Sequence, residues 1–484
     1  YMSEFSNVLS LFIKTRDVNV SALTAYCELD RSTMYKLING KRSPSSKALV
    51  QKLASFMNLN PLETQELIQA YLLSKVGWEI YYSRKNVLEF LLSFADVRSE
   101  ASFFTDSPSP AFDFNFAVAE KGTSTLSSQL QIVAAINSVI AQMQTKSQST
   151  LSILAQPEHL EGLNLAASLP NQNSNMHIQH ILCINNRKSY IRSQQNYNIQ
   201  CLKKLIPFYE KPVIYEPYYY YDNVNSHFNN LNFLPCMFLT DSAAILCSSD
   251  LKEGILIQEP ETIALFQSRF QKILMNTSPL TATFHSILNL HLKNFAVIYK
   301  DSSNAYGLSA EPCLVPLFTQ ELIDKYLEES LPSRDVLMQE LIQYTSTLSR
   351  ATTHIYFTRE GAMHFLMTGY LHEIPRGLCK PFEYEDRVKL LKKFCEQAEN
   401  SQDIRLLKGS LEKFPLNLNI SITVNYGYLM FSGQSTELSY ILLKEQNLLA
   451  SFYDFASSLE ENELLETKEE TIQFLQNLIQ HKKL

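Results

Sequence analysis

Apolar residues recur at three- and four-residue spacing through the first 76 positions, which is the pattern of amphipathic helices. Phe5, Leu9 and Phe12 lie on one face of a first helix, together with Val8 and Ile13, and this helix is expected to end near residues 17–19. The same pattern predicts four further helices, over residues 21–27, 31–38, about 45–57 and from Pro61 onward.

The ends of these helices carry residues that usually start and stop helices. Asp30 is a suitable N-cap for the third helix, because its carboxylate accepts hydrogen bonds from free backbone N–H groups. Gly40 suits the left-handed backbone that often follows a helix. Pro61 suits the first position of the fifth helix, where the missing N–H has no cost. The head of the chain is therefore expected to be an all-α domain.

The pattern changes after Gly77. Residues 78–94 are expected to be helical, and residues 96–127 are irregular, with Ser107-Pro108-Ser109-Pro110 as a turn-rich boundary. Helical periodicity returns over residues 126–143, and short apolar runs then alternate with amphipathic stretches. Strands are predicted at 178–184, 213–221, 236–239, 243–247, 295–299, 354–357, 420–425 and 428–431, and helices at 199–209, 259–273, 333–347, 437–459 and 468–479.

A hairpin followed by a helix occurs twice in this series, which suggests a duplicated unit of about 150 residues. The expected fold class is α+β multidomain, with an all-α, five-helix helix-turn-helix head followed by a mixed α/β body. The expected domains are residues 2–76, a helical connector and linker over 77–127, and two halves of the body over 128–280 and 281–484.

Charge separates the head from the rest of the chain. Six basic and no acidic residues fall between Arg31 and Lys52. Residues 1–77 contain nine basic and six acidic residues, a net charge of +3, and because the whole chain has −7, residues 78–484 carry −10. A basic segment on an acidic chain is typical of a DNA-binding head joined to a sensing or assembly module.

The remaining composition indicates a globular, cytoplasmic protein. The 484 residues are 45% hydrophobic, which is enough for several packed cores. The eight cysteines lack C-x-x-C spacing, so they favour reduced thiols over a zinc ribbon or a disulfide scaffold. An apolar run of about 18 residues and a signal-peptide pattern are both missing, so no membrane association is expected.

Two short helices separated by a tight turn form a helix-turn-helix. The chain resembles the Cro and lambda-repressor (XRE) family over residues 4 to about 73, on the pattern of Leu23, Leu29, Asp30, Met34, Leu37, Asn39, Gly40, Lys41 and Pro44. It departs from the family at Thr24, where a small alanine is usual, and at Glu28, where a turn glycine is usual. The turn must therefore reach its geometry without glycine.

The resemblance implies that the helix beginning at Arg31 docks in the major groove of double-stranded DNA. Arg31, Ser32, Tyr35 and Lys36 would then face the bases, with Thr33 beside them. Arg31 is the strongest candidate, because a guanidinium bonds both O6 and N7 of a guanine, worth roughly 1–3 kcal/mol of discrimination.

The loop after this helix resembles the family's phosphate-contacting segment. Its residues are Asn39, Lys41, Arg42 and Ser43. Phosphate contacts set the register on DNA and its salt dependence without reading sequence. Lys47 and Lys52 are interpreted as solvated residues outside this contact.

The body resembles effector modules of larger bacterial XRE-type regulators and, more distantly, the phospholipase-D-like fold. The hydrolases of that fold carry His-x-Lys-x4-Asp in each half, and no such string occurs here. Motifs for nucleotide binding, zinc hydrolases and serine hydrolases are also missing, so no enzyme activity, cofactor or catalytic residue is expected. His354 and His364 flank a strand-like segment and are interpreted as structural residues, so no metal site is predicted.

Two places in the body are candidates for an effector. The tyrosine-rich strand, with Tyr215 and Tyr219, could offer alternate phenols to a ligand or peptide, although packing of alternate rings in a core is the favoured interpretation. Arg359 and Arg376 could bind an anionic effector.

These features predict a DNA-binding transcriptional regulator that acts as a homodimer and responds to a small-molecule or peptide effector. Dimerisation is expected because two heads one helical turn apart would read a near-palindrome. One alternative is an enzyme or toxin-system component in which the helix-turn-helix only autoregulates, and catalytic residues in the body would distinguish it. Another is an adaptor whose head binds protein, which salt-insensitive binding would reveal.

Overall fold

The structure, a computed structural model, describes residues 3–92, 94, 122–171, 175–186, 196–228, 233–284, 304–348, 353–374, 377–432 and 438–480. Contacts among these residues divide the chain into two units. The first contains residues 3–86 with Asn196, and the second begins at Val87. Each unit has a hydrophobic core of its own.

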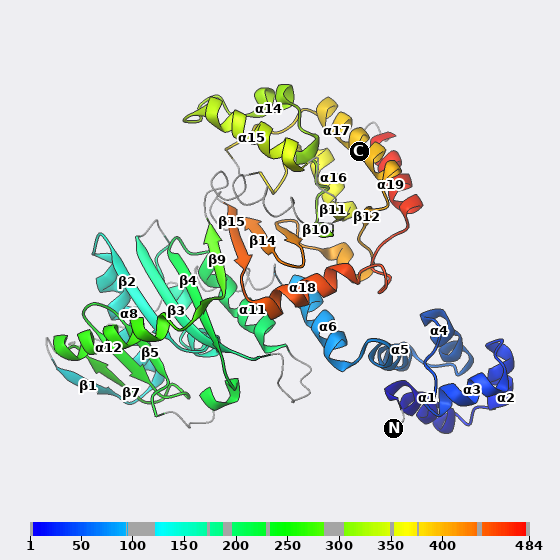
Figure 1. Cartoon of the computed structure of the whole chain (residues 1–484), viewed down its shortest axis with the longest axis horizontal. Coiled ribbons are helices and arrows are strands. Elements are labelled where there is room, and N and C mark those ends of the chain that lie inside the picture. Colours follow the sequence, from blue (N-terminus) through cyan, green and yellow to red (C-terminus); the bar gives the residue numbers. More distant parts are fainter. Residues whose placement is uncertain are drawn as a thin grey trace. The chain divides into compact units, whose positions relative to one another are not determined.

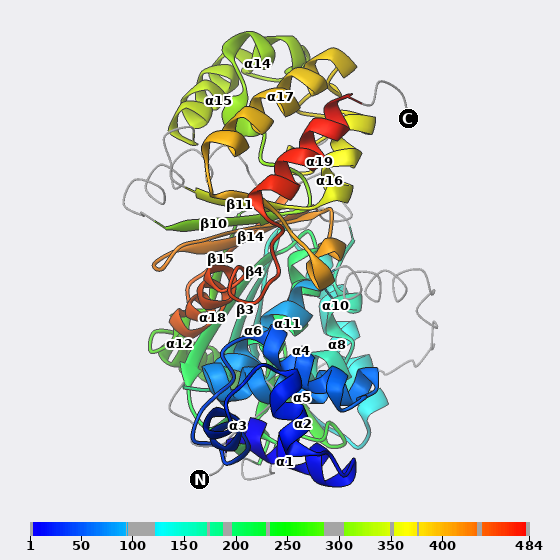
Figure 2. The ribbon, with the colours of Figure 1, turned by 90° about the vertical axis from the view of Figure 1, so that its right-hand side faces the viewer.

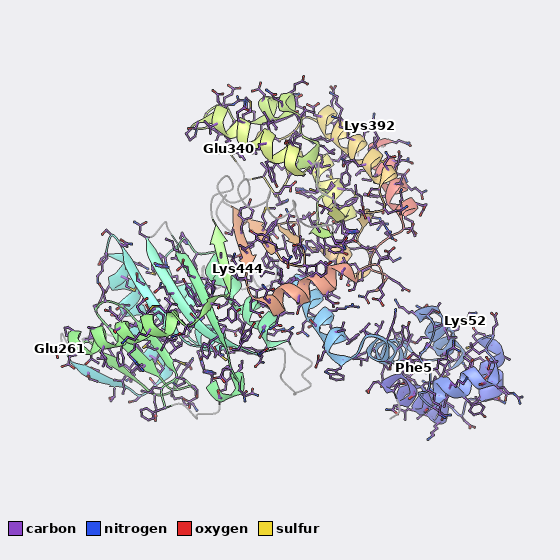
Figure 3. All side chains as sticks on the ribbon, in the orientation of Figure 1. Phe5, Lys52, Glu261, Glu340, Lys392 and Lys444 are labelled. Carbon is purple, nitrogen blue, oxygen red and sulfur yellow. The ribbon has the colours of Figure 1, made fainter. Side chains whose placement is uncertain are left out.

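The first unit is helical in each place where the sequence predicts a helix (Figure 1). Its core contains fully buried side chains from successive helices, among them Phe5, Leu23 and Met34. Phe5 is buried and Lys52 is exposed, and both are labelled in Figure 3. The helices are α1 (Glu4–Thr15), α2 (Val20–Tyr26), α3 (Arg31–Ile38), α4 (Lys47–Phe56), α5 (Pro61–Val76) and the first part of α6 (Trp78–Leu92).

Local chemistry fixes the start of α5 and ties it to α1. The Asn60 side chain accepts a hydrogen bond from the Glu63 N–H, and the Glu63 carboxylate accepts one from the Asn60 N–H, which is a capping box. Pro61 occupies the first helical position, as predicted. The Glu63 carboxylate also lies 2.7 Å from the Arg16 guanidinium at the end of α1.

The second unit is a mixed α/β structure with two mixed sheets. The first sheet has the strand order β1-β7-β6-β5-β2-β3-β4-β8. Strands β2, β3 and β4 are parallel, and the other neighbours are antiparallel. The strands are β1 (Thr123–Leu126), β2 (Ser149–Leu154), β3 (Met176–Ile184), β4 (Ile214–Tyr221), β5 (Cys236–Leu239), β6 (Ala244–Cys247), β7 (Gly254–Ile257) and β8 (Ser278–Pro279).

The second sheet repeats this order, as β12-β11-β10-β13-β14-β15-β9. Strands β10, β11 and β12 are parallel, and the remaining pairs are antiparallel, so each strand from β9 to β15 takes the place of its counterpart from β1 to β7. The repeat suggested by the two hairpins is therefore present in the topology. The strands are β9 (Thr281–Phe284), β10 (Ala305–Ser309), β11 (Thr353–Phe357), β12 (Ile404–Leu406), β13 (Leu418–Ile422), β14 (Gly427–Ser432) and β15 (Leu438–Leu443).

Helices cover the faces of both sheets. Figure 2 shows α16, α17 and α19 on one side of the strands β10, β11 and β14, with α18 on the other side. The helices of this unit are α8 (Gln129–Gln144), α9 (Pro157–Gly162), α10 (Leu165–Ser168), α11 (Tyr197–Tyr209), α12 (Pro260–Leu274), α14 (Gln320–Tyr326), α15 (Arg334–Leu348), α16 (Arg359–Thr368), α17 (Tyr384–Asn400), α18 (Gln446–Ser457) and α19 (Lys468–Gln480), with short 3-10 turns at Val224–His227, Val315–Leu317 and Gly409–Lys413.

Alternate side chains of the strands enter different cores, as the pleat requires. Ile181 of β3 packs in a cluster with Phe270 of α12, on the outer face of the first sheet. Its neighbour Leu182 belongs to a larger cluster that continues through Phe431 of β14 to Phe452 of α18. Each such fully buried side chain stabilises the fold by roughly 1.5–3 kcal/mol.

Several sequence predictions fail in this unit. Residues 438–443 form strand β15, although a helix is predicted over 437–459, and helix α18 begins only at Gln446. A mostly apolar run such as Leu438–Leu443, interrupted only by Ser439, is typical both of a strand buried on both faces and of a buried helix, so periodicity alone cannot separate them. Strand β1 lies within the stretch predicted as irregular, and β2, β7, β8, β9, β10 and β12 are not predicted at all. The predicted strand at 295–299 and the turn-rich boundary at 107–110 lie outside the described residues.

Candidate nucleic-acid interface

The turn between α2 and α3 forms without glycine. Glu28 adopts the left-handed backbone with φ 56°. The Cro and lambda-repressor family, which the sequence resembles, usually has glycine at this position. The N–H of Glu28 donates to the Ala25 carbonyl, and the N–H of Leu29 donates to the Thr24 carbonyl at 3.1 Å, which closes the end of α2. Such a backbone is strained for a residue other than glycine, at a cost of about 1–2 kcal/mol.

The start of α3 is fixed by its N-cap, as predicted. The Asp30 carboxylate accepts hydrogen bonds from the Thr33 N–H at 2.8 Å and from the Thr33 hydroxyl at 2.6 Å. The Thr33 hydroxyl lowers the pKa of Asp30 more than any other contact, so this carboxylate stays ionised. Because the Thr33 hydroxyl donates this hydrogen bond to Asp30, the Thr33 side chain forms part of the helix cap.

The outward face of α3 is polar and exposed. Met34 and Leu37 are buried in the core, which turns Arg31, Tyr35 and Lys36 to the surface. Tyr35 is 57% exposed, a large value for an aromatic side chain. Ser32 is also exposed and Thr33 half-buried, so the five residues predicted to read bases lie on or beside one surface.

The segment after α3 is held by backbone bonds to the helix. Gly40 has φ 70°, and the N–H groups of Lys41 and Arg42 both donate to the Lys36 carbonyl, at 2.8 and 3.2 Å. This arrangement is a Schellman motif, which ends a helix and fixes the direction of the chain that leaves it. The side chains of Asn39, Lys41, Arg42 and Ser43 are exposed, next to the C-terminal end of α3.

Four cationic side chains dominate the charge of this surface. Within the described part of the chain, Arg31, Lys36, Lys41 and Arg42 form no ion pair. Lys52, in contrast, lies 3.7 Å from the Glu28 carboxylate, which places a negative charge beside the same surface. We call the surface formed by residues 31–36 and 39–43 the basic face.

The effector residues that the structure describes, Tyr215, Tyr219 and Arg359, have separate surroundings. Tyr215 is buried, with its hydroxyl 2.7 Å from Nδ1 of His180 and its ring stacked on Phe208. Tyr219 is half-buried and packs against Tyr221. The interpretation that alternate tyrosines pack in the core holds for Tyr215 but not for Tyr221 of the same face, which is exposed, and Tyr218 and Tyr220 of the other face are half-buried against a second cluster.

Of the two predicted arginines, only Arg359 is among the described residues. The Arg359 guanidinium lies 2.8 Å from the carboxylate of Glu466, which precedes α19, and over the ring of Phe474 in α19, so its charge is already paired within the protein. Arg376 lies outside the described residues.

A cavity of about 750 Å³ opens on the second sheet, and the sequence does not predict it. Its floor consists of residues of β10, β13 and β14, including Gly307, Ser309, Ser421 and Tyr428. Its walls come mainly from α17 and from the segment after β10, with Glu373 at one side. Small or polar residues alternating with apolar ones in these strands are the signal that could have indicated it. Tyr215, Tyr219 and Arg359 are not among its described lining residues.

No helix within the described residues is both long and apolar enough to cross a lipid bilayer.

Comparisons with known proteins leave the family open. No protein-family model and no curated protein matches the chain. Phosphatidylserine synthase from Haemophilus influenzae Rd KW20 is 10% identical at a TM-score of 0.22, over 74% of this chain and 91% of that chain. TrmBL2, an archaeal chromatin protein with a novel mode of DNA binding, is 10% identical at a TM-score of 0.20, over 47% of this chain and 78% of that chain. TM-scores this low support no argument about fold or function.

Proposed function

We propose that this chain is a sequence-specific DNA-binding transcriptional regulator of the XRE type, whose helix-turn-helix consists of α2, the turn at Glu28 and α3. The observation that carries the proposal is the basic face. Its cations, which have no ion-pair partner among the described residues, lie on the outward side of a short helix that follows a tight turn, and the next segment continues the positive surface. A polyanion with a groove that admits a helix is the partner that fits this surface best.

In this proposal the two parts of the basic face have different roles. Arg31, Ser32, Tyr35 and Lys36 contact base edges, and Arg31 reads a guanine. Asn39, Lys41, Arg42 and Ser43 contact phosphates, which supplies most of the affinity and makes it dependent on salt. The Schellman motif supports this division because it fixes the segment after α3 close to the end of the reading helix.

The body serves dimerisation and effector sensing in this proposal and carries no catalytic activity. The net charge of −10 over residues 78–484 repels DNA and so directs DNA to the head. The cavity on the second sheet, with its polar floor and volume of about 750 Å³, is the size of a small-molecule site. Two heads in a homodimer would contact two half-sites about one helical turn apart.

The test begins with selection of binding sites from random duplexes by the full-length protein, followed by fluorescence anisotropy on the selected site. Arg31→Ala is expected to weaken binding roughly 5- to 100-fold and to relax the preference at one base pair. Lys41→Ala is expected to weaken binding to all sequences and to reduce the salt slope by about one.

Lys252→Ala is the matched control, because it removes one exposed lysine from the body. Its affinity should equal that of the wild type. Unchanged, sequence-specific binding by Arg31→Ala would show that α3 is not the reading helix. Binding that does not respond to salt would instead favour a protein-binding head.

A further inference from the structure

Two histidines and a glutamate from three separate segments meet in the second half of the body. Oε1 of Glu311 lies 2.9 Å from Nδ1 of His364 and 2.9 Å from Nδ1 of His372. One ligand atom from each residue lies within 4.8 Å of one from each of the others. The centroids of the two imidazole rings are 5.0 Å apart, and the Nδ1 atoms of both rings contact the Glu311 carboxylate.

The backbone around this cluster brings the three segments together. Thr358, the N-cap of α16, binds the Ala310 carbonyl through both its N–H, at 2.9 Å, and its hydroxyl, at 3.0 Å. Gly361 then lets α16 approach so closely that a Cβ at this position would overlap the Ala310 backbone. His364 follows one turn later on the same side of α16, which places it over Glu311.

The chain after α16 returns to the same carboxylate. Gly369 ends the helix with φ 72°, and the N–H of His372 donates to Oε2 of Glu311 at 2.7 Å. Glu311 is only 5% exposed, whereas both histidine side chains are about one-quarter exposed, so the cluster is open on one side.

A second carboxylate, that of Glu373, lies close to the cluster. Glu373 is close enough to Glu311 for their charges to interact. Its Oε1 is buried and, among the described residues, has no hydrogen-bond partner. A buried polar atom without a partner is costly, so this oxygen favours a bound group close to the cluster.

We infer that Glu311, His364 and His372 bind one divalent transition-metal ion, with Zn²⁺ the best fit. Two imidazole nitrogens and one carboxylate oxygen are a common zinc ligand set, and Zn–N and Zn–O bonds of about 2.0–2.2 Å place bonded ligand atoms roughly 3–3.5 Å apart. The present distances of 2.9 Å are close to that range. The Glu311 carboxylate would balance one of the two charges of the ion.

The ion would link the segment after β10, α16 and the segment at residues 370–374. It would thus fix the segment that carries Glu373, which borders the cavity on the second sheet. The fourth position is open on the exposed side of the histidines, where water or a ligand oxygen completes the coordination.

The test uses untagged, full-length protein stripped with a chelator, then titrated with Zn²⁺ by calorimetry and assayed for retained metal after gel filtration. The wild type should bind one equivalent and melt at a higher temperature with the ion. His372→Ala and Glu311→Gln should each weaken binding at least tenfold. The matched control is His177→Ala, because His177 also lies 2.7 Å from a carboxylate, that of Glu216, in a pair that is not part of the cluster.

Co²⁺ provides a readout that does not depend on the variants folding. Bound at nitrogen and oxygen ligands, Co²⁺ should show ligand-field bands in the visible spectrum without thiolate charge-transfer bands, which separates this site from adventitious binding to the eight cysteines. A wild type without these bands and without a stoichiometric Zn²⁺ site would overturn the inference. Equal retention by wild type, Glu311→Gln and His177→Ala would overturn it as well.

Discussion

The strained turn before α3 leads to a quantitative prediction for Glu28→Gly. The left-handed backbone costs a residue with a side chain about 1–2 kcal/mol, and glycine removes this cost. Glycine also gains about 0.4–1 kcal/mol of entropy in the unfolded chain, which offsets part of the benefit. The variant should therefore be more stable by about 0.5–1 kcal/mol. With an m-value of about 1 kcal/mol/M for a unit this small, the urea midpoint should rise by about 0.5–1 M.

The only tryptophan of the chain makes the assay specific for the first unit. Trp78 opens α6 and packs against Tyr82, whose hydroxyl lies 3.3 Å from the Gln69 side chain of α5. Its fluorescence therefore reports unfolding of this unit in the full-length protein. Two variants serve as controls.

Glu28→Gln keeps the strained backbone and should leave the midpoint nearly unchanged. Asp17→Gly relieves another left-handed residue, with φ 47°, outside the basic face, and should raise the midpoint less, because aspartate tolerates this backbone better. A lower midpoint for Glu28→Gly, or an equal rise for Glu28→Gln, would refute the strain argument. In the proposed complex, both Glu28 variants should bind DNA more tightly, by up to about fivefold, since each removes one carboxylate beside the basic face.

Three further predictions concern the second unit. Gly361→Ala should destabilise it by about 3 kcal/mol, because the added methyl overlaps the Ala310 backbone. The control is Gly307→Ala, whose Cβ would have ordinary contacts. Equal melting temperatures for the two variants would contradict the reasoning. Burial lowers the pKa of His180 to about 4, so only the unfolded chain takes up this proton as the pH falls from 6.5 to 4. Stability should decline by up to about 3 kcal/mol across that window, and urea titrations of His180→Asn should show a shallower decline. Tyr209→Phe should cost about 1–2 kcal/mol in the same titrations, because the buried Thr281 hydroxyl, 2.6 Å from the phenol, loses its partner; an unchanged midpoint would count against this bond.

The sequence predicts the helices of the first unit well because their signals are local. Asp30, Gly40 and Pro61 each act within one turn of the residues that they cap, so their roles can be recognised without knowledge of the tertiary structure. The exposure of Arg31 and Lys36 follows from the burial of Met34 and Leu37 in the same way. The DNA contact itself stays a prediction.

The sequence predicts the second unit less completely because its decisive contacts are distant along the chain. Strand β10 has glycine at its centre and only five residues, so it lacks the apolar run that identifies a strand, yet it lies between β11 and β13 in the sheet. The histidine cluster joins Glu311 to residues more than 50 positions later, with no ligand spacing of a known motif. The sequence therefore favours a structural interpretation of His364, and only the fold reveals its neighbours.

The repeated strand order has a consequence for stoichiometry. Each chain holds two topologically equivalent halves but one head, and the halves have diverged: tyrosines fill the core beside β4, whereas the cavity and the histidine cluster belong to the half that begins at β9. The internal pair is therefore asymmetric, and titrations counted per chain should saturate at one cavity ligand, one metal ion and one DNA half-site. A homodimer would therefore bind one cavity ligand and one metal ion for each DNA half-site that it occupies.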